Sequence, residues 1–283
     1  MTERLVVVGV GMASGRMLEH LFEVDMDRFN VTLLRAEPRG SSGRIMLSSV
    51  LAGEKTFAEI ITHDADWYAD HKVACRFGET ITRIDRKVKV VYSACGETPY
   101  DQLLIATGSA PFIIPIAGKE LPGVMAFRDL DDVQTMVAAA EKANVNAVII
   151  GGGLLGLEAA AALWLRGVNV GVLHLMGHLM ERQLDPAAGC LLQKELEGRG
   201  IRIHCEAQTK AILRDGQAGA VLLEDGTIYP ADIVVMAVGI RPEVRIATDA
   251  RLYVERGIVV DDRMFTSDPD ILAVGECCEH RNI

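Results

Sequence analysis

The sequence lacks several features that point to common classes of protein. Its six cysteines are scattered and include no pair separated by two residues, so no secreted disulfide framework is indicated. Basic residues are comparatively few, with 29 Lys and Arg against 39 Asp and Glu and a net charge of -10. This balance gives no general attraction to phosphate backbones or anionic lipid, so we expect neither a nucleic-acid partner nor a membrane partner.

Long apolar runs are also scarce. The segment 145–165 has the length of a bilayer span, but it contains Asn146, Glu158 and four glycines, which suits a strand, a turn and a buried helix better. The short apolar stretch near the N-terminus follows the acidic Glu3 and is broken by glycines, which argues against a signal peptide. With 49% hydrophobic and 24% charged residues in 283 positions, we expect a globular cytoplasmic protein of two domains.

A strand, turn, helix and strand pattern opens the chain. Leu5–Val8 is a short apolar run that ends at Gly9, which is typical of a strand buried on both faces. An amphipathic helix is predicted over 15–24, and a second apolar strand over 30–34. Such a unit predicts parallel strands joined by a crossover helix.

The same pattern returns about halfway along the chain. Ala147–Ile150 is apolar, Gly151–Gly156 forms the turn, an alanine-rich helix follows over 157–166, and 168–173 is the next strand. Two copies predict an α/β fold with two Rossmann-like nucleotide-binding domains. Short β-rich segments between and after them, with hairpin turns at Ser93–Glu97 and Asp225–Thr227, predict antiparallel crossovers.

The first glycine turn, GVGMAS, matches GxGxxG with Ser14 in the third position. Gly9 permits the tight turn, and Gly11 lets the backbone approach a pyrophosphate at the helix N-terminus. Glu37 lies after the second strand, where an acid is expected to bind the adenosine ribose.

The second turn, GGGLLG, matches the full pattern at Gly151, Gly153 and Gly156. His174 occupies the position of the ribose-binding acid. A histidine neither accepts both ribose hydroxyls nor repels a 2′-phosphate, so NADH and NADPH both remain open. A strand-end histidine facing solvent is the alternative interpretation of His174.

Eight ordered motifs resemble one superfamily: LVVVGVGMAS, AEPRG, RIMLS, LLIATGSAPF, VIIGGGLLGLEAA, RQLDP, VGIRP and TSDPDILAVGEC. They follow the FAD-dependent pyridine nucleotide-disulfide oxidoreductases. Within that superfamily, GGGLLGLEAA, RQLD and GEC most resemble the FAD/NAD(P)H region of the assimilatory NAD(P)H nitrite reductase large subunit.

The resemblance implies two cofactor sites. Residues implied to contact FAD are Gly9, Gly11, Met12, Ala13, Ser14, Glu37, Arg44, Ile81, Ala106, Thr107, Gly108, Gly275 and Glu276. Those implied to contact NADH or NADPH are Gly151, Gly153, Leu154, Leu155, Gly156, Glu158, His174 and Gly239.

It also implies a domain order. A first part of the FAD-binding domain is expected at 1–113, an inserted NAD(P)H-binding domain at 114–243, and the second part of the FAD-binding domain at 244–283. Because family members continue beyond this point, we expect the second part to be truncated, either as an excised fragment or as an unusually short natural chain.

The residues limit the chemistry. Disulfide reductases of the superfamily carry CxxxxC in the helix after the second strand, but SSGRIMLSSVLAG at 41–53 has no cysteine. We therefore expect hydride transfer from the nicotinamide to the flavin and direct onward transfer of electrons, with no catalytic side chain. Glu158 is the nearest catalytic candidate, and helix N-terminal stabilisation is its alternative role.

A metal site is not expected. Cys277, Cys278 and His280 cluster, but no further ligand pair completes a tetrahedral set. We expect the two cysteines to begin a helix, a position that lowers a thiol pKa. His63, with His71 and His178, lies among polar residues and is expected on the surface.

The predicted function is an NAD(P)H-oxidising flavoprotein module that passes electrons to a downstream iron-sulfur or sirohaem domain, as in nitrite reduction. A free-standing enzyme that resembles a rubredoxin or ferredoxin reductase, with a small redox protein as partner, is one alternative. A nucleotide-binding fragment without turnover is another, because Val10 and Ser42 depart from the family pattern.

Overall fold

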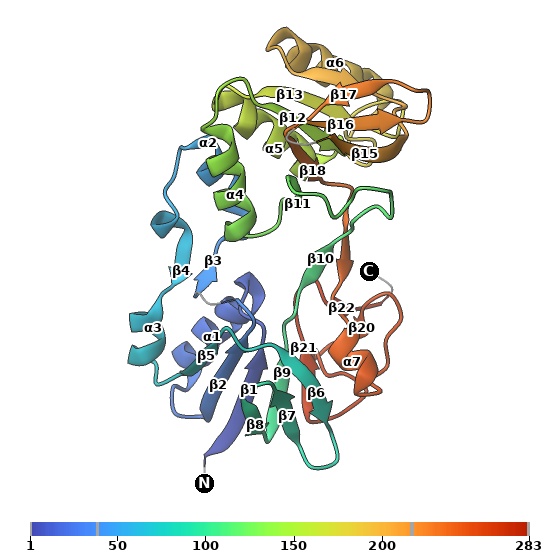
Figure 1. Cartoon of the computed structure of the whole chain (residues 1–283). Helices are drawn as coiled ribbons and strands as arrows, with labels where there is room; N and C mark the ends of the chain where they lie inside the picture. The colour runs from blue at the N-terminus through green and yellow to red at the C-terminus, as the bar shows by residue number, and fades with distance from the viewer. Residues whose placement is uncertain (1, 38–39, 216–217, 282–283) are drawn as a thin grey trace. The chain divides into compact units, whose positions relative to one another are not determined.

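The computed structural model describes residues 2–37, 40–215 and 218–281, which form two compact units (Figure 1). Unit 1 comprises Met1–Gly43, Ile60–Ala110 and Arg241–Ile283, and unit 2 comprises Arg44–Glu59 and Pro111–Ile240. Segment 44–59 therefore belongs to unit 2, although it lies within the range 1–113 that the sequence assigned to the first domain. Residues 38 and 39 of the AEPRG motif lie outside the described residues.

Unit 1 is built on a parallel sheet of five strands in the order β21-β9-β1-β2-β5. The strands are β1 Glu3–Val8, β2 Phe29–Arg35, β5 Ala74–Phe77, β9 Gln102–Ile105 and β21 Ile271–Ala273. Helix α1, Met12–Val24, connects β1 to β2 and buries Leu18. The apolar residues of β1 are almost fully enclosed, as expected of a parallel strand covered on both faces. The predicted βαβ unit is confirmed.

Smaller elements complete unit 1. They are β3 Ser41–Ser42, β4 Ile61–His63, α3 Ala65–Asp70, β6 Ile81–Asp85, β7 Val90–Ser93, β8 Gly96–Pro99, α7 Arg245–Asp249, β20 Ile258–Val259 and β22 Cys278–Glu279. Strands β6, β7 and β8 form an antiparallel meander. Ser93 pairs with Gly96 at its second turn, which confirms the hairpin predicted from SACGE.

Unit 2 repeats the design with a parallel sheet in the order β11-β18-β12-β13-β14. Its strands are β11 Val124–Ala126, β12 Asn146–Ile150, β13 Asn169–Leu173, β14 Arg202–His204 and β18 Ile233–Met236. The helices are α2 Leu47–Ala52, α4 Leu130–Ala140, α5 Leu154–Leu165 and α6 Pro186–Gly198. A short 3-10 turn lies at Arg44–Met46, and a second, Ala58–Ile60, spans the point where the chain passes from unit 2 to unit 1. Helix α2 packs against α4 and α5.

An antiparallel meander accompanies the second sheet. It consists of β15 Thr209–Asp215, β16 Ala218–Leu223 and β17 Ile228–Pro230, and the predicted hairpin at Asp225–Thr227 joins the last two strands. Two further short strands, β10 Ser109–Pro111 and β19 Ile240–Pro242, lie where the chain passes from one unit to the other. Among the helices of the described ranges, we find none that combines the length and the apolar character needed to cross a bilayer.

Candidate functional site

The turn after β1 depends on a close approach between two backbones. Gly9 has a φ of +99°, and a Cβ built on it would lie 2.3 Å from the carbonyl oxygen of Ala106. Its N–H donates to the carbonyl oxygen of Leu34 at 2.9 Å. Both the left-handed backbone and the short contact require glycine here, whatever the turn binds.

Gly11 is different, because a Cβ at this position would meet no atom within 4 Å. It is the N-cap of α1, so it borders open space at a helix N-terminus, where unpaired N–H groups and the helix dipole attract anions. Met12 and Ala13 are exposed beside it. Ser14 is fully buried, and its hydroxyl accepts from the Gly11 N–H at 3.0 Å, which closes the turn internally.

The turn after β12 reproduces these relations in unit 2. A Cβ on Gly151 would lie 2.3 Å from the carbonyl oxygen of Ala237, and one on Gly153 would meet no atom within 4 Å. At Gly156 a Cβ would lie only 2.0 Å from the Gly151 carbonyl oxygen, so a side chain such as that of Ser14 does not fit at this third position. Local crowding explains why one turn ends in serine and the other in glycine.

Other predicted residues gather at the carboxyl edge of the unit 1 sheet, where parallel α/β folds bind ligands. Ala106, Thr107 and Gly108 follow β9, and Gly275 and Glu276 follow β21. A Cβ on Gly275 would lie 3.1 Å from that of Ala13, so the first and last motifs meet here. The Thr107 hydroxyl donates to the carbonyl oxygen of Glu243, and the Glu243 N–H donates to that of Gly108.

Sequence reasoning missed Ser109 and Arg35, which hold the two predicted acids of unit 1. The buried Ser109 hydroxyl donates to Oε2 of Glu276 at 2.7 Å. The Arg35 guanidinium is 4% exposed and pairs with the Glu37 carboxylate. An arginine directly after the apolar pair Leu33 and Leu34 was the available signal, because a buried guanidinium needs an anionic partner.

The remaining predicted residues lie at three kinds of position. Ile81 is buried at the start of β6, in register with Ser93. Arg44 is assigned to unit 2, whereas the first turn is assigned to unit 1. In unit 2, Gly239 has a φ of +113°, and the early residues of α5 include the exposed Leu154, the half-buried Leu155 and the exposed Glu158.

His174 is buried with 6% exposure, so the interpretation of a solvent-facing histidine is wrong. The prediction of a surface position for His63 is also wrong. His63 is 5% exposed, with Nε2 placed 2.8 Å from Oε1 of Glu19 and its ring packed against Trp67. In both cases a carboxylate distant in the sequence faces the ring, Glu181 beside His174 and Glu19 beside His63.

Neither the position nor the pKa of the Cys277 and Cys278 thiols is as predicted. Cys277 is fully buried and Cys278 begins the short strand β22, so neither starts a helix. Burial raises the pKa of both thiols, because the charged thiolate loses its hydration. His280 contacts Asp262 at 2.7 Å. Within residues 2–37, 40–215 and 218–281, we find no group of three or more potential metal ligands.

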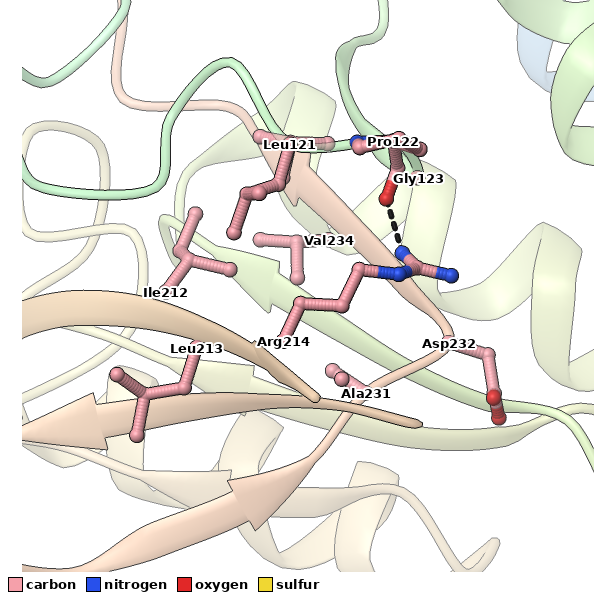
Figure 2. A pocket seen from close by; sticks show the side chains of 11 residues that line it. Leu121, Pro122, Gly123, Ile212, Leu213, Arg214, Ala231, Asp232 and Val234 are labelled. Atoms are coloured by element: carbon pink, nitrogen blue, oxygen red, sulfur yellow. Dashed lines mark hydrogen bonds between the residues drawn. The ribbon is translucent and has the colours of Figure 1, made fainter. Parts of the chain in front are cut away.

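A small hollow in unit 2 is lined by Leu121, Pro122, Ile212, Arg214, Asp232 and their neighbours (Figure 2). The Arg214 guanidinium donates to the carbonyl oxygen of Pro122 across it. Its volume of about 10 Å³ has room for roughly one water molecule. The residues that line it include none of those predicted to contact a cofactor, and the hollow is too small for a nucleotide.

Two parallel-sheet units, each with a glycine turn at a helix N-terminus, define the dinucleotide-binding class of folds. Residues 3–283 match the family described as pyridine nucleotide-disulphide oxidoreductase, and the chain belongs to this family.

Comparisons with individual proteins agree with the family. The chain is 46% identical over 282 residues to the NAD(P)H nitrite reductase of Bacillus subtilis (strain 168), covering 99% of this chain and 35% of that protein. It is 32% identical over 283 residues to a rubredoxin-NAD(+) reductase of Pseudomonas putida, covering 99% and 73% respectively. The solved structure of an NAD-dependent persulfide reductase from A. fulgidus matches with a TM-score of 0.93 at 29% identity, over 98% of this chain and 53% of that one. The chain spans about a third of the length of the nitrite reductase.

Proposed function

We infer that the chain is a cytoplasmic FAD-dependent NAD(P)H oxidoreductase module of the nitrite reductase type. The observation that carries this inference is the pair of matched glycine turns, one in each unit, in a chain that aligns over 99% of its length with a nitrite reductase. The absence of cysteine from 41–53 supports electron transfer that does not pass through a thiol pair.

The residues present fit two dinucleotides. At Gly11 and Gly153 the missing side chain leaves open space at the start of α1 and α5, where a Cβ would occupy the place of a phosphate. We assign the first turn, with Glu37 and the residues gathered after β9 and β21, to FAD. We assign the second turn to NADH or NADPH, and we keep 1–113, 114–243 and 244–283 as the proposed domain order.

The side chains have binding and orienting roles in this proposal. A bound flavin supplies the capacity to take a hydride from the nicotinamide and to release electrons one at a time. Glu276, held by Ser109, provides a carboxylate for the ribityl hydroxyls, and the N-termini of α1 and α5 offer N–H donors to the two pyrophosphates. We nominate no side chain for proton transfer, because positioning alone contributes on the order of 7–11 kcal/mol of barrier lowering.

An absorption spectrum of the purified chain, before and after addition of NADH without oxygen, tests the proposal. Flavin bands that bleach on addition are the expected result. A protein that stays colourless after incubation with FAD would instead support a nucleotide-binding fragment without turnover.

A rubredoxin reductase-like enzyme is the second candidate, favoured by the alignment with the Pseudomonas putida protein. An acceptor screen separates the two candidates. The nitrite reductase type predicts that the chain alone consumes no nitrite with NADH and reduces a sirohaem partner domain in preference to rubredoxin.

A further inference from the structure

The side chain of His174 is turned into the second glycine turn. It directly follows β13, and its Nδ1 accepts from the Gly152 N–H at 3.1 Å. A Cβ on Gly152 would lie 2.8 Å from Cγ of the ring, so the imidazole packs directly on this glycine. Because Nδ1 accepts a hydrogen bond, the hydrogen of the neutral ring is on Nε2. The ring therefore belongs to the framework of the turn and is not presented to a ribose.

A carboxylate lies beside the other ring nitrogen. Oε2 of Glu181 is 3.1 Å from Nε2, although the two atoms are not aligned as a good hydrogen bond. The Met180 N–H donates to the carbonyl oxygen of Gly152 at 3.0 Å, and Met180 has a φ of +57°. The loop after β13 is thus tied to the glycine turn through Met180 and His174, and it returns Glu181 to the end of the strand.

The position and charge of Glu181 match those of a ribose-binding acid. Its side chain is 27% exposed, and its poor alignment with the histidine leaves acceptor capacity on the carboxylate. An acid at the carboxyl end of this strand accepts from the ribose 2′-hydroxyl of NAD and opposes the 2′-phosphate of NADP. The next residue in the chain, Arg182, is exposed, and the Glu206 N–H donates to the carbonyl oxygen of Met176 in the same loop.

We propose that Glu181, positioned by His174, contacts the adenosine ribose and makes this site selective for NADH over NADPH. The inference rests on the proposed function and extends it, because it names the coenzyme that the second turn selects. Arg182 is the competing candidate, since a cation at the same place would favour a 2′-phosphate.

Two ligand fragments that differ only by the 2′-phosphate provide the test. The full chain is saturated with FAD, and the dissociation constants of 5′-AMP and 2′,5′-ADP are measured by calorimetry. We expect 5′-AMP to bind at least about tenfold more tightly, because a carboxylate opposes the added phosphate. Glu181→Gln is expected to bring the two constants within about threefold of each other. Glu195→Gln removes an exposed acid of α6 that pairs with Arg199, and it should leave the ratio of the 2′,5′-ADP dissociation constant to the 5′-AMP dissociation constant unchanged.

A His174→Phe variant separates positioning from packing. It keeps a planar ring and removes both nitrogens. If His174 positions Glu181, this variant lowers the ratio of the two dissociation constants, as Glu181→Gln does. A merely structural role would weaken both fragments equally and leave the ratio as it was, which would overturn the role of His174.

The experiment distinguishes failure of the proposed function from failure of the Glu181 assignment. If a folded chain, verified by circular dichroism, binds neither fragment, the proposed pyridine-nucleotide site is wrong. If it binds both fragments equally, or if its preference is for 2′,5′-ADP and disappears in Arg182→Gln, the assignment of Glu181 alone is overturned.

Discussion

The hydroxyl of Ser109 donates to Oε2 of Glu276 at 2.7 Å, which links the start of β10 to the loop after β21. Hydrogen bonds to charged groups contribute about 1.5–3 kcal/mol. The bond therefore fixes the carboxylate that we assign to the ribityl chain. It also restricts the rotational freedom of the glutamate side chain, which is one methylene longer than that of an aspartate.

Ser109→Ala is expected to weaken FAD binding roughly tenfold, because Glu276 loses one of its orienting donors. Equilibrium dialysis with flavin fluorescence measures the change. Thr248→Ala is the control, since it removes an exposed hydroxyl of α7 in the same unit. Equal FAD affinity in the two variants would show that Ser109 does not orient Glu276.

Gly9 and Gly11 are expected to respond differently to a single added methyl group. Gly9→Ala introduces a clash 2.3 Å from the Ala106 carbonyl oxygen and an unfavourable φ, so the free energy of unfolding should fall by about 2 kcal/mol or more. Gly11→Ala meets no atom within 4 Å, so its stability should stay near that of the parent while FAD binding is lost. Urea unfolding and flavin retention, measured on both variants, check the contrast. A stable Gly9→Ala would contradict it.

Asp132 near the start of α4 should make stability depend on pH. Burial, and then the carboxylate of Asp129, raise the pKa of Asp132 to about 6. Since the unfolded value is about 3.9, the folded state binds this proton more tightly. The resulting stabilisation is complete below about pH 4 and is lost as the pH rises through about 6.

Asp132→Asn keeps an oxygen that accepts from the Arg128 N–H, but it does not ionise. We expect the stability of this variant relative to the parent to increase between about pH 4.5 and about pH 7.5. Urea midpoints at the two pH values measure this. Glu120→Gln, whose side chain is 85% exposed, controls for the change in net charge. A relative stability that does not vary with pH would rule out the raised pKa.

The cysteines should differ in their reactivity with iodoacetamide. Cys95 and Cys190 are exposed and should react in the folded chain, whereas Cys277 is fully buried and has a raised pKa. Cys75 should also react slowly, because burial raises its pKa to about 11. Peptide mass spectrometry before and after unfolding measures the order of labelling. Rapid labelling of Cys277 in the folded chain would be inconsistent with its burial.

Regular elements were predictable because their signals are local. The apolar run at 5–8 and the glycine that follows it predicted β1 and its turn, and the same pattern predicted β12. Both hairpins followed from short turn sequences. Val10, a departure from the family pattern, is buried in the core under the first turn, which explains an apolar side chain at this position.

Long-range partners were not predictable in the same way. Glu181 lies seven positions beyond the place where a ribose-binding acid was expected, and only the folded loop brings it beside His174. The same holds for Glu19 beside His63, where the partners are 44 residues apart in the sequence. The environment of a titratable side chain depends on such contacts, and local spacing does not encode them.

The sequence by itself determined two Rossmann-like nucleotide-binding folds and the family of the chain, because strand periodicity, glycine turns and ordered motifs are properties of neighbouring residues. Tertiary structure alone decided which side chains face one another at the carboxyl edges of the two sheets: Ser109 with Glu276 in unit 1, and His174 with Glu181 in unit 2. It also decided that Cys277 is buried and that segment 44–59 packs with unit 2. These outcomes depend on burial and on hydrogen bonds between distant segments, which form only when the chain has closed on itself.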